Sequence, residues 1–153
     1  MGEYVRTTQE RTLDSLYPPL ATAIHNHIEK YELGDDIETS VVMCCETVST
    51  KEVKKWFSRK TEVMHTGVIL TPQWLIWAST KDDKSLGVLS ARLRDIRVQD
   101  YENTKMYEMI QDTGLNIDGL RTADGPGSAF IGLGPEPAAQ KFRALLQDAI
   151  AKV

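Results

Sequence analysis

The chain has 153 residues, 41% of them hydrophobic and 26% charged, and a formal net charge of -4 at pH 7. This composition is typical of one globular domain and excludes a disordered or fibrous class. The negative net charge argues against a dedicated nucleic-acid-binding protein, which needs a broad basic face. No apolar run approaches the roughly 20 residues that cross a bilayer, and no signal-peptide core opens the chain, so we expect a cytoplasmic protein.

The first 34 residues carry a helical pattern, with apolar residues at three- and four-residue steps. The residues of this stripe are Leu13, Leu16, Tyr17, Leu20, Ile24, Ile28 and Tyr31. Pro18 and Pro19 interrupt the stripe. We therefore expect a short helix to about Leu16 and a second helix from Pro19 to just before Gly34. Residues 1–34 are assigned to an N-terminal helical extension.

From Ile37 onward the period of the apolar residues changes to two, which is typical of strands. Strands are expected at residues 37–46, 66–70, 74–79, 89–93, 106–110, 115–120 and 129–133, with a second short run at 96–98 after Asp95. Short polar or proline-containing turns separate them, and no helical pattern alternates with them. The pattern therefore favours an antiparallel sheet, a barrel or a sandwich.

The last 20 residues, "GPEPAAQKFRALLQDAIAKV", predict the clearest helix of the chain. Proline and glutamate stand at its start and lysine in its last turn, as helix termini prefer. Its apolar stripe consists of Ala138, Phe142, Leu145, Leu146, Ala149, Ile150 and Val153. A helix with such a stripe after a series of antiparallel strands would close the open end of a barrel.

Four stretches, "ELGDDIETSVV", "TGVILTPQWLIW", "LSARLRDIRVQDY" and "SAFIGLGPEPAAQKFRALLQDAI", occur in this order and together span roughly residues 33–152. They resemble the bacterial PH-like and GRAM-like branch of the pleckstrin-homology superfold. The resemblance implies an α+β fold in residues 35–153, namely an antiparallel β-barrel of about seven strands capped by the C-terminal helix. It also implies a binding module for phosphoinositide headgroups, peptides or partner proteins.

The segment "KEVKKWFSRK" is the best candidate for a ligand or lipid site. Its basic and aromatic residues are Lys51, Lys54, Lys55, Trp56, Phe57, Arg59 and Lys60. In a PH-like barrel this segment would be the loop between the first two strands, where lipid-binding relatives place their phosphate-contacting cations. Each cation gains about 1 kcal/mol near an anionic membrane, and an aromatic pair can insert at the interface. The alternative is a solvated loop whose aromatic residues pack on the barrel or on a partner.

Trp74 and Trp77 are candidates for an interaction surface. They have opposite parity in one predicted strand, so one of them points away from the barrel interior. An outward tryptophan needs cover from the N-terminal helices, a second subunit or a ligand. We favour the N-terminal helices, whose apolar stripe also needs a partner surface.

Metal, redox and catalytic sites are not indicated. Cys44 and Cys45 are adjacent, so on a strand they point to opposite faces, and we expect two small apolar side chains. His25 and His27 lie on different sides of a predicted helix, and His65 has no second ligand nearby in sequence. Carboxylates fall mostly at predicted turns. The glycines of "GLGPEPA" are interpreted as turn and helix-approach positions, because no βαβ unit surrounds them.

The sequence therefore favours a non-catalytic binding module without a cofactor. We expect it to bind a protein partner, or itself as a homo-oligomer, through exposed strand edges and the surface from Trp56 to Trp77. The alternative is peripheral binding to an anionic membrane through residues 51–60. A second alternative, a small-ligand carrier or enzyme with a cavity inside the barrel, is disfavoured by the shortage of histidine and of paired catalytic residues.

Overall fold

In the computed structural model, residues 4–34, 36–82 and 84–153 are described, and they contain eight strands and three α-helices. The strands are β1 (Val5–Arg11), β2 (Met43–Lys55), β3 (Ser58–Leu70), β4 (Trp74–Lys81), β5 (Ser85–Arg92), β6 (Arg97–Asp100), β7 (Gly114–Thr122) and β8 (Gly125–Gly132). The helices are α1 (Pro18–Lys30), α2 (Met106–Met109) and α3 (Pro137–Ala151), with 3-10 turns at Leu13–Ser15, Leu93–Asp95 and Tyr101–Asn103. No helix in these ranges is long and apolar enough to cross a membrane.

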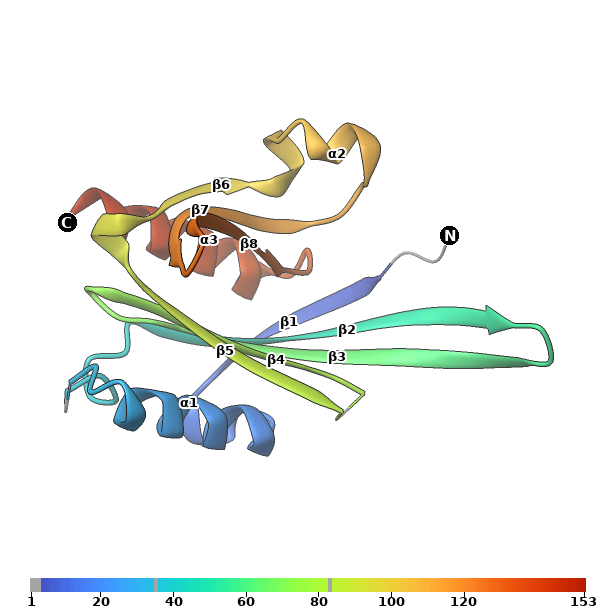
Figure 1. The fold of residues 1–153 in the computed structure, drawn as a ribbon, viewed down its shortest axis with the longest axis horizontal. Coiled ribbons are helices and arrows are strands. Elements are labelled where there is room, and N and C mark those ends of the chain that lie inside the picture. Colours follow the sequence, from blue (N-terminus) through green and yellow to red (C-terminus); the bar gives the residue numbers. More distant parts are fainter. Residues whose placement is uncertain (1–3, 35, 83) are drawn as a thin grey trace.

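The strands form two antiparallel sheets, one of five strands in the order β1-β2-β3-β4-β5 and one of three in the order β6-β7-β8. Figure 1 shows the second sheet and α3 on one side of the first sheet, and α1 on the other. The mainly β fold with a C-terminal helix is thus confirmed. In the described part of the chain no strand pairing joins the two sheets, so the expected barrel of about seven strands is not closed.

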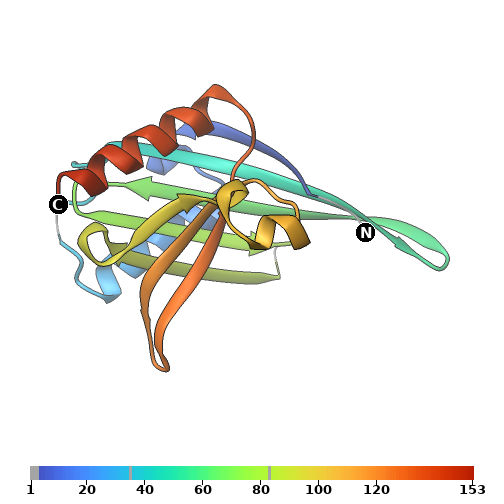
Figure 2. The ribbon, with the colours of Figure 1, turned by 90° about the horizontal axis from the view of Figure 1, so that it is seen from above.

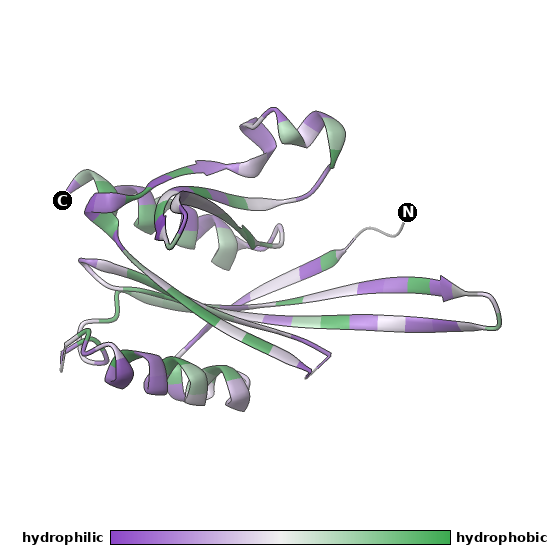
Figure 3. Ribbon diagram, in the orientation of Figure 1, coloured by the Kyte–Doolittle hydropathy of each residue, from purple (hydrophilic) through white to green (hydrophobic). Residues whose placement is uncertain are grey.

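The part of the five-stranded sheet that lies between the helices is buried on both of its faces. Its inner face shares a hydrophobic cluster with the second sheet and α3, and Trp77 and Cys45 point into this cluster. Its outer face shares a second cluster with α1, and Cys44 belongs to that cluster. The predicted opposite orientation of the adjacent cysteines is confirmed. In Figure 3, hydrophobic residues gather where the sheet lies between the helices, and the far end of the β2–β3 hairpin is mainly hydrophilic.

Helix α1 covers the outer face because its apolar residues recur at helical spacing. Its buried side chains are Leu20, Ile24 and Ile28. A Cβ added at Gly67 in β3 would lie 3.2 Å from Leu16 Cδ1, so this glycine lets the chain before the helix approach the sheet closely. The second predicted helix of the N-terminal extension is confirmed. The first is a 3-10 turn of three residues.

Strand β1 lies in the N-terminal segment for which only helices were expected. Its sequence, VRTTQER, lacks an apolar alternation, so sequence periodicity does not predict a strand. It pairs with the first half of β2 and forms one edge of the five-stranded sheet. Its buried residues are Arg6 and Thr8, both polar. In its described part, residues 4–34, the N-terminal extension is therefore a strand followed by a helix, which corrects the expectation of helices alone; residues 1–3 lie outside the described residues.

Hydrogen bonds of the Arg6 and Thr8 side chains fasten β1 to the residues just before β7 and just after β8, and also to the neighbouring strand β2. The Arg6 guanidinium donates to both Asp112 carboxylate oxygens at 2.9 and 2.8 Å and to Ser49 Oγ at 2.6 Å. Thr8 Oγ1 accepts a hydrogen bond from the Gly134 N–H at 2.9 Å. A Cβ added at Gly134 would lie 2.5 Å from the Arg6 carbonyl oxygen, so a side chain does not fit there. Gly134 therefore serves the close approach of β1 as well as the turn before α3.

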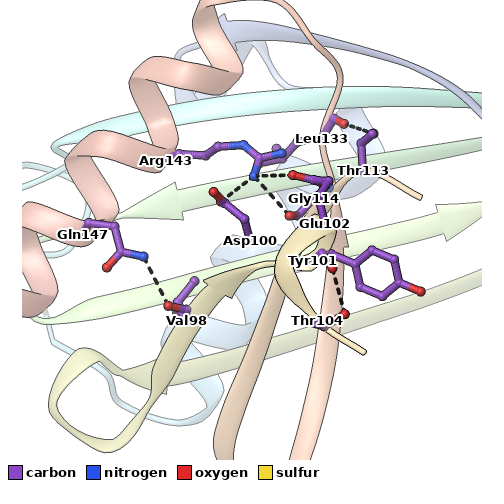
Figure 4. A network of polar contacts seen from close by, with 10 residues as sticks. All are labelled: Val98, Asp100, Tyr101, Glu102, Thr104, Thr113, Gly114, Leu133, Arg143 and Gln147. Atoms are coloured by element: carbon purple, nitrogen blue, oxygen red, sulfur yellow. Dashed lines mark hydrogen bonds and ion pairs between the residues drawn. The ribbon is translucent and has the colours of Figure 1, made fainter. Parts of the chain in front are cut away.

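Helix α3 is held on the second sheet by apolar and polar contacts. Phe142 is fully buried in the inner cluster. Figure 4 shows Arg143, whose Nη1 donates to the carboxylates of Asp100 and Glu102 and, at 3.2 Å, to the Gly114 carbonyl oxygen. These bonds tie the helix to the end of β6 and the start of β7.

Two other expectations are wrong. Strand β2 begins at Met43, whereas Ile37 lies in a turn and packs against the α1 cluster. Residues 106–110, expected to be a strand, include the short helix α2. Their apolar residues are spaced at three and four positions, and in so short a run this spacing fits a helical turn as well as it fits a strand.

The Arg6 contacts are expected to stabilise the fold. Arg6→Ala should lower the free energy of unfolding by about 3 kcal/mol, because Asp112 loses the partner that neutralises it. Arg11→Ala on the same strand is the matched control and should change it by less than about 0.5 kcal/mol, since Arg11 is exposed. Urea denaturation followed by circular dichroism measures both values. If Arg6→Ala and Arg11→Ala lowered the free energy of unfolding equally, the Arg6 contacts would add no more stability than an exposed arginine does.

Candidate functional site

The β2–β3 hairpin extends beyond the rest of the sheet. The two strands pair as far as Lys55↔Ser58. The flanking strands stop earlier, because β1 pairs with β2 only up to Thr50 and β4 pairs with β3 only up to Met64. Residues 51–63, here named the projecting hairpin, therefore pair with no third strand among the residues that the structure describes, and they reach out from the body (Figures 1 and 2). The segment expected as a loop is thus mostly strand.

Two aromatic residues form the turn of the projecting hairpin. Trp56 is 91% exposed and Phe57 is 93% exposed, and their rings lie 6.2 Å apart in an edge-to-face arrangement. Two-residue hairpin turns prefer glycine, asparagine or aspartate. Neither turn formation nor core packing therefore explains why large aromatic residues stand at this tip. Their exposure leaves both rings free to contact a ligand or another surface.

The cations of the projecting hairpin differ in their surroundings. Lys51 Nζ lies 5.4 Å from the centre of the Tyr4 ring, and Lys60 Nζ lies 4.0 Å from Asp82 Oδ2. Lys54 and Arg59 form no ion pair with an acidic side chain in the described ranges.

Lys54 and Arg59 are also direct register partners across the two strands. Like charges directly opposite each other destabilise an antiparallel pair, and an anion bound between them would relieve the repulsion. The side chain of Lys55, the fifth predicted cation, lies outside what the structure describes.

The projecting hairpin has a charge opposite to that of the whole chain. Five basic and two acidic residues between positions 51 and 62 give this stretch a net charge of +3, against -4 for the chain. One of the acids, Glu62, is paired with Lys81 at 3.4 Å. Figure 3 shows hydrophilic residues along most of this segment. The arrangement is an exposed aromatic tip behind which cations are concentrated.

The structure places Trp74 and Trp77 away from any open surface of this kind. Trp77 is 4% exposed and lies in the inner cluster, so its side chain is not available to a partner. Trp74 is half-buried on the outer face, packs against the α1 cluster, and has the Arg92 guanidinium 4.7 Å from its ring. The parity prediction and the covering of the outward tryptophan by the N-terminal helix are confirmed. A continuous surface from Trp56 to Trp77 is not formed.

The side chains of His25 and His27 form hydrogen bonds to other side chains. His25 Nδ1 is bonded to Glu38 Oε1, and His27 Nε2 to Ser90 Oγ at 2.8 Å. Burial, and then the charge of Lys30, lower the pKa of His27. In the described part of the chain no group of three histidine, cysteine or acidic residues could hold a metal ion.

The two cysteines are free thiols on opposite sides of one strand. Burial is the main cause that raises the pKa of both Cys44 and Cys45 to about 12. At neutral pH both therefore stay protonated, and protonated buried thiols are poor nucleophiles and poor metal ligands.

Comparison with models of known protein families gives no match, and comparison with curated proteins gives none either. Any functional proposal for this chain therefore depends on the geometry of its own residues.

Sequence reasoning found the basic and aromatic composition of the hairpin but not the differences among its cations. Tyr4 and Asp82, the neighbours of Lys51 and Lys60, come from segments far away in the chain, and no local pattern marks them. The sequence alone could have predicted that Lys54 and Arg59 lie opposite each other. This arrangement follows once Trp56 and Phe57 are taken as a two-residue turn.

The tip residues are expected to contribute nothing to stability. Replacing Trp56 and Phe57 together with serine should change the free energy of unfolding by less than about 0.5 kcal/mol, because both side chains are exposed. Trp77→Ala, in the core, should lower it by about 3–5 kcal/mol. Chemical denaturation of the two variants measures both effects. A large loss on replacing the tip would mean that Trp56 and Phe57 pack in the free protein.

Proposed function

We propose that this protein is a non-catalytic binding module that docks on an anionic lipid surface through the projecting hairpin. The observation that carries the proposal is the exposed pair Trp56 and Phe57 next to Lys54 and Arg59, which have no acidic partner in the described chain. Tryptophan and phenylalanine favour the membrane interface, and cations behind them meet lipid phosphates. The alternative in which the aromatic residues pack on the body is disfavoured by their exposure.

The length of the projecting hairpin separates its tip from the net negative charge of the body. From Lys51 to the tip, strand geometry gives a reach of up to about 20 Å. This exceeds the Debye length of about 8 Å at physiological ionic strength. The net negative charge of the body is therefore largely screened from a membrane touched by the tip. The local charge of +3 on residues 51–62 then governs the interaction.

The magnitudes are sufficient for reversible binding. Each cation near an anionic surface contributes about 1 kcal/mol. Lys54 and Arg59 also lose their mutual repulsion when an anion lies between them. Insertion of two aromatic rings adds burial of apolar surface at about 25 cal/mol per Å². Cations and an apolar tip together act as the two signals that peripheral membrane binding requires.

The proposed fold class is PH-like, with an added N-terminal strand and helix. From β2 onward the chain runs through four strands of the first sheet, three strands of the second sheet and the helix α3. This order supports the resemblance of residues 33–152 to that superfold. In such a fold, β2 and β3 are the first two strands, and the projecting hairpin is their connection. The open seam between the sheets is then a departure from a fully closed barrel.

Sedimentation with vesicles containing phosphatidylserine tests the proposal. The wild-type protein should bind at low salt and lose affinity as salt rises. Lys54→Glu combined with Arg59→Glu should weaken binding at least tenfold, because two attractive contacts become repulsive.

Arg11→Glu combined with Lys30→Glu is the matched control. Both residues are exposed and lie outside the hairpin, and the change in net charge is the same. This variant should bind like the wild type. An equal loss in the two variants, or no binding of the wild type at low salt, would contradict docking by the hairpin.

A further inference from the structure

The strand β5 is a free edge of the five-stranded sheet. It pairs with β4 along its whole length, from Lys81↔Ser85 to Trp74↔Arg92. In an antiparallel edge strand, every second residue points its N–H and C=O away from the neighbouring strand. Within the described ranges no backbone group pairs with this outer side of β5. The edge therefore offers a row of hydrogen-bonding groups that a further strand could use.

This edge lacks the features that normally prevent strand addition. Natural edge strands are protected by charged residues, proline or bulges. The stretch from Ser85 to Ala91 contains no charge and no proline, and no register shift interrupts its ladder with β4. Leu86 is 51% exposed and Leu89 is 49% exposed. The opposite edge, β1, differs because it carries Arg6, Glu10 and Arg11 in seven residues.

A groove runs along β5 where the two sheets do not join. The hollow has a volume of about 380 Å³, and apolar side chains on its two sides include Leu89, Ile96 and Leu120. Figure 2 shows the β7–β8 hairpin crossing the sheet and extending past the β5 edge. A strand added to β5 would lie beneath this hairpin. The groove would thus give it both backbone partners and apolar contacts.

Arginine side chains give the groove a positive rim. Arg92 and Arg121 line the hollow, and Arg94 lies next to it. Asp95 is the acidic residue that lines the hollow. Its Oδ1 lies 4.0 Å from Arg94 Nε and 3.8 Å from Arg121 Nη2, so two arginines share this one carboxylate. The rim therefore has an excess of positive charge. A complementary ligand carries carboxylates.

We propose that this groove binds an extended peptide segment with alternating apolar and acidic residues. The segment adds as a strand to β5, its apolar side chains contact Leu89 and Leu120, and its carboxylates pair with Arg92 and Arg121. A second copy paired through its own β5 is a poorer occupant, because its Ser85–Ala91 stretch has no carboxylate to offer these arginines. The proposal is independent of lipid binding, because it uses neither the tip nor the cations of the projecting hairpin.

Selection from a phage-displayed library of random peptides tests the proposal. Peptides selected on the wild-type protein should alternate apolar and acidic residues. A synthetic copy of a selected peptide should shift the NMR signals of β5 amides. Leu89→Lys, and Arg92→Glu combined with Arg121→Glu, should each weaken its binding at least tenfold. These positions are exposed or half-exposed, and circular dichroism checks that the variants fold.

Two control variants separate this site from other surfaces. Arg11→Glu lies on the opposite edge strand, and Lys54→Glu with Arg59→Glu lies on the projecting hairpin, and both should bind the peptide like the wild type. The proposal is overturned if selected peptides lack acidic residues, or if they bind the Leu89→Lys variant equally. It is also overturned if the signals that move belong to the hairpin. A wild-type dimer that Leu89→Lys dissociates would assign the edge to a second copy and reject the peptide.

Discussion

The constraint on which the rest of the structure depends is that the five-stranded sheet is covered on both faces. The second sheet and α3 cover the inner face, and α1 covers the outer face. Apolar strands such as "GVIL" in β3 and "LIW" in β4 are needed for both clusters, so their side chains are not free for ligands. The accessible parts of the covered sheet are its margins, that is, its edge strands and the ends of its hairpins. Two such margins are the end of the β2–β3 hairpin and the outer side of β5.

The packing of the two sheets also requires the polar contacts of β1. A strand with buried Arg6 and Thr8 can lie against the second sheet only if their polar groups are satisfied. Asp112, Ser49 and Gly134 supply these partners. Asp112 just before β7 and Gly134 just after β8 thereby hold the two sheets together at one side through bonds to side chains instead of a strand ladder. At the other side, the described residues form no equivalent contact across the space next to β5, and a groove remains there.

Local periodicity was enough to predict α3, α1, the β3–β4 pair and the opposite orientation of Trp74 and Trp77. These features depend on apolar residues at regular spacing, which a single segment displays. Strand β1 could not be predicted in this way, because its burial depends on partners far away in the chain, such as Asp112. The failure to close a barrel also depends on long-range pairing that no local pattern encodes.

For the candidate site, too, the local sequence predicted some features, and long-range strand pairing determined the others. Composition identified a basic and aromatic segment, but a loop and a projecting hairpin have the same composition. Only the end of pairing at Thr50 and Met64 distinguishes them, because among the described residues it leaves the outer half of β2 and β3 without a third strand. The ladder also places Lys54 opposite Arg59, and this arrangement makes an anionic ligand more favourable than the number of cations alone suggests.

The central claim is that the tip of the hairpin enters the interface of an anionic bilayer. The most direct measurement is quenching of tryptophan fluorescence by lipids brominated at different acyl positions, compared between the wild type and Trp56→Phe. Trp74 and Trp77, the other two tryptophans, are half-buried and buried. The account predicts quenching of the wild type, strongest for bromine close to the headgroup, and its loss in Trp56→Phe. Absence of quenching in vesicle-bound protein, or equal quenching of the two proteins, would contradict it.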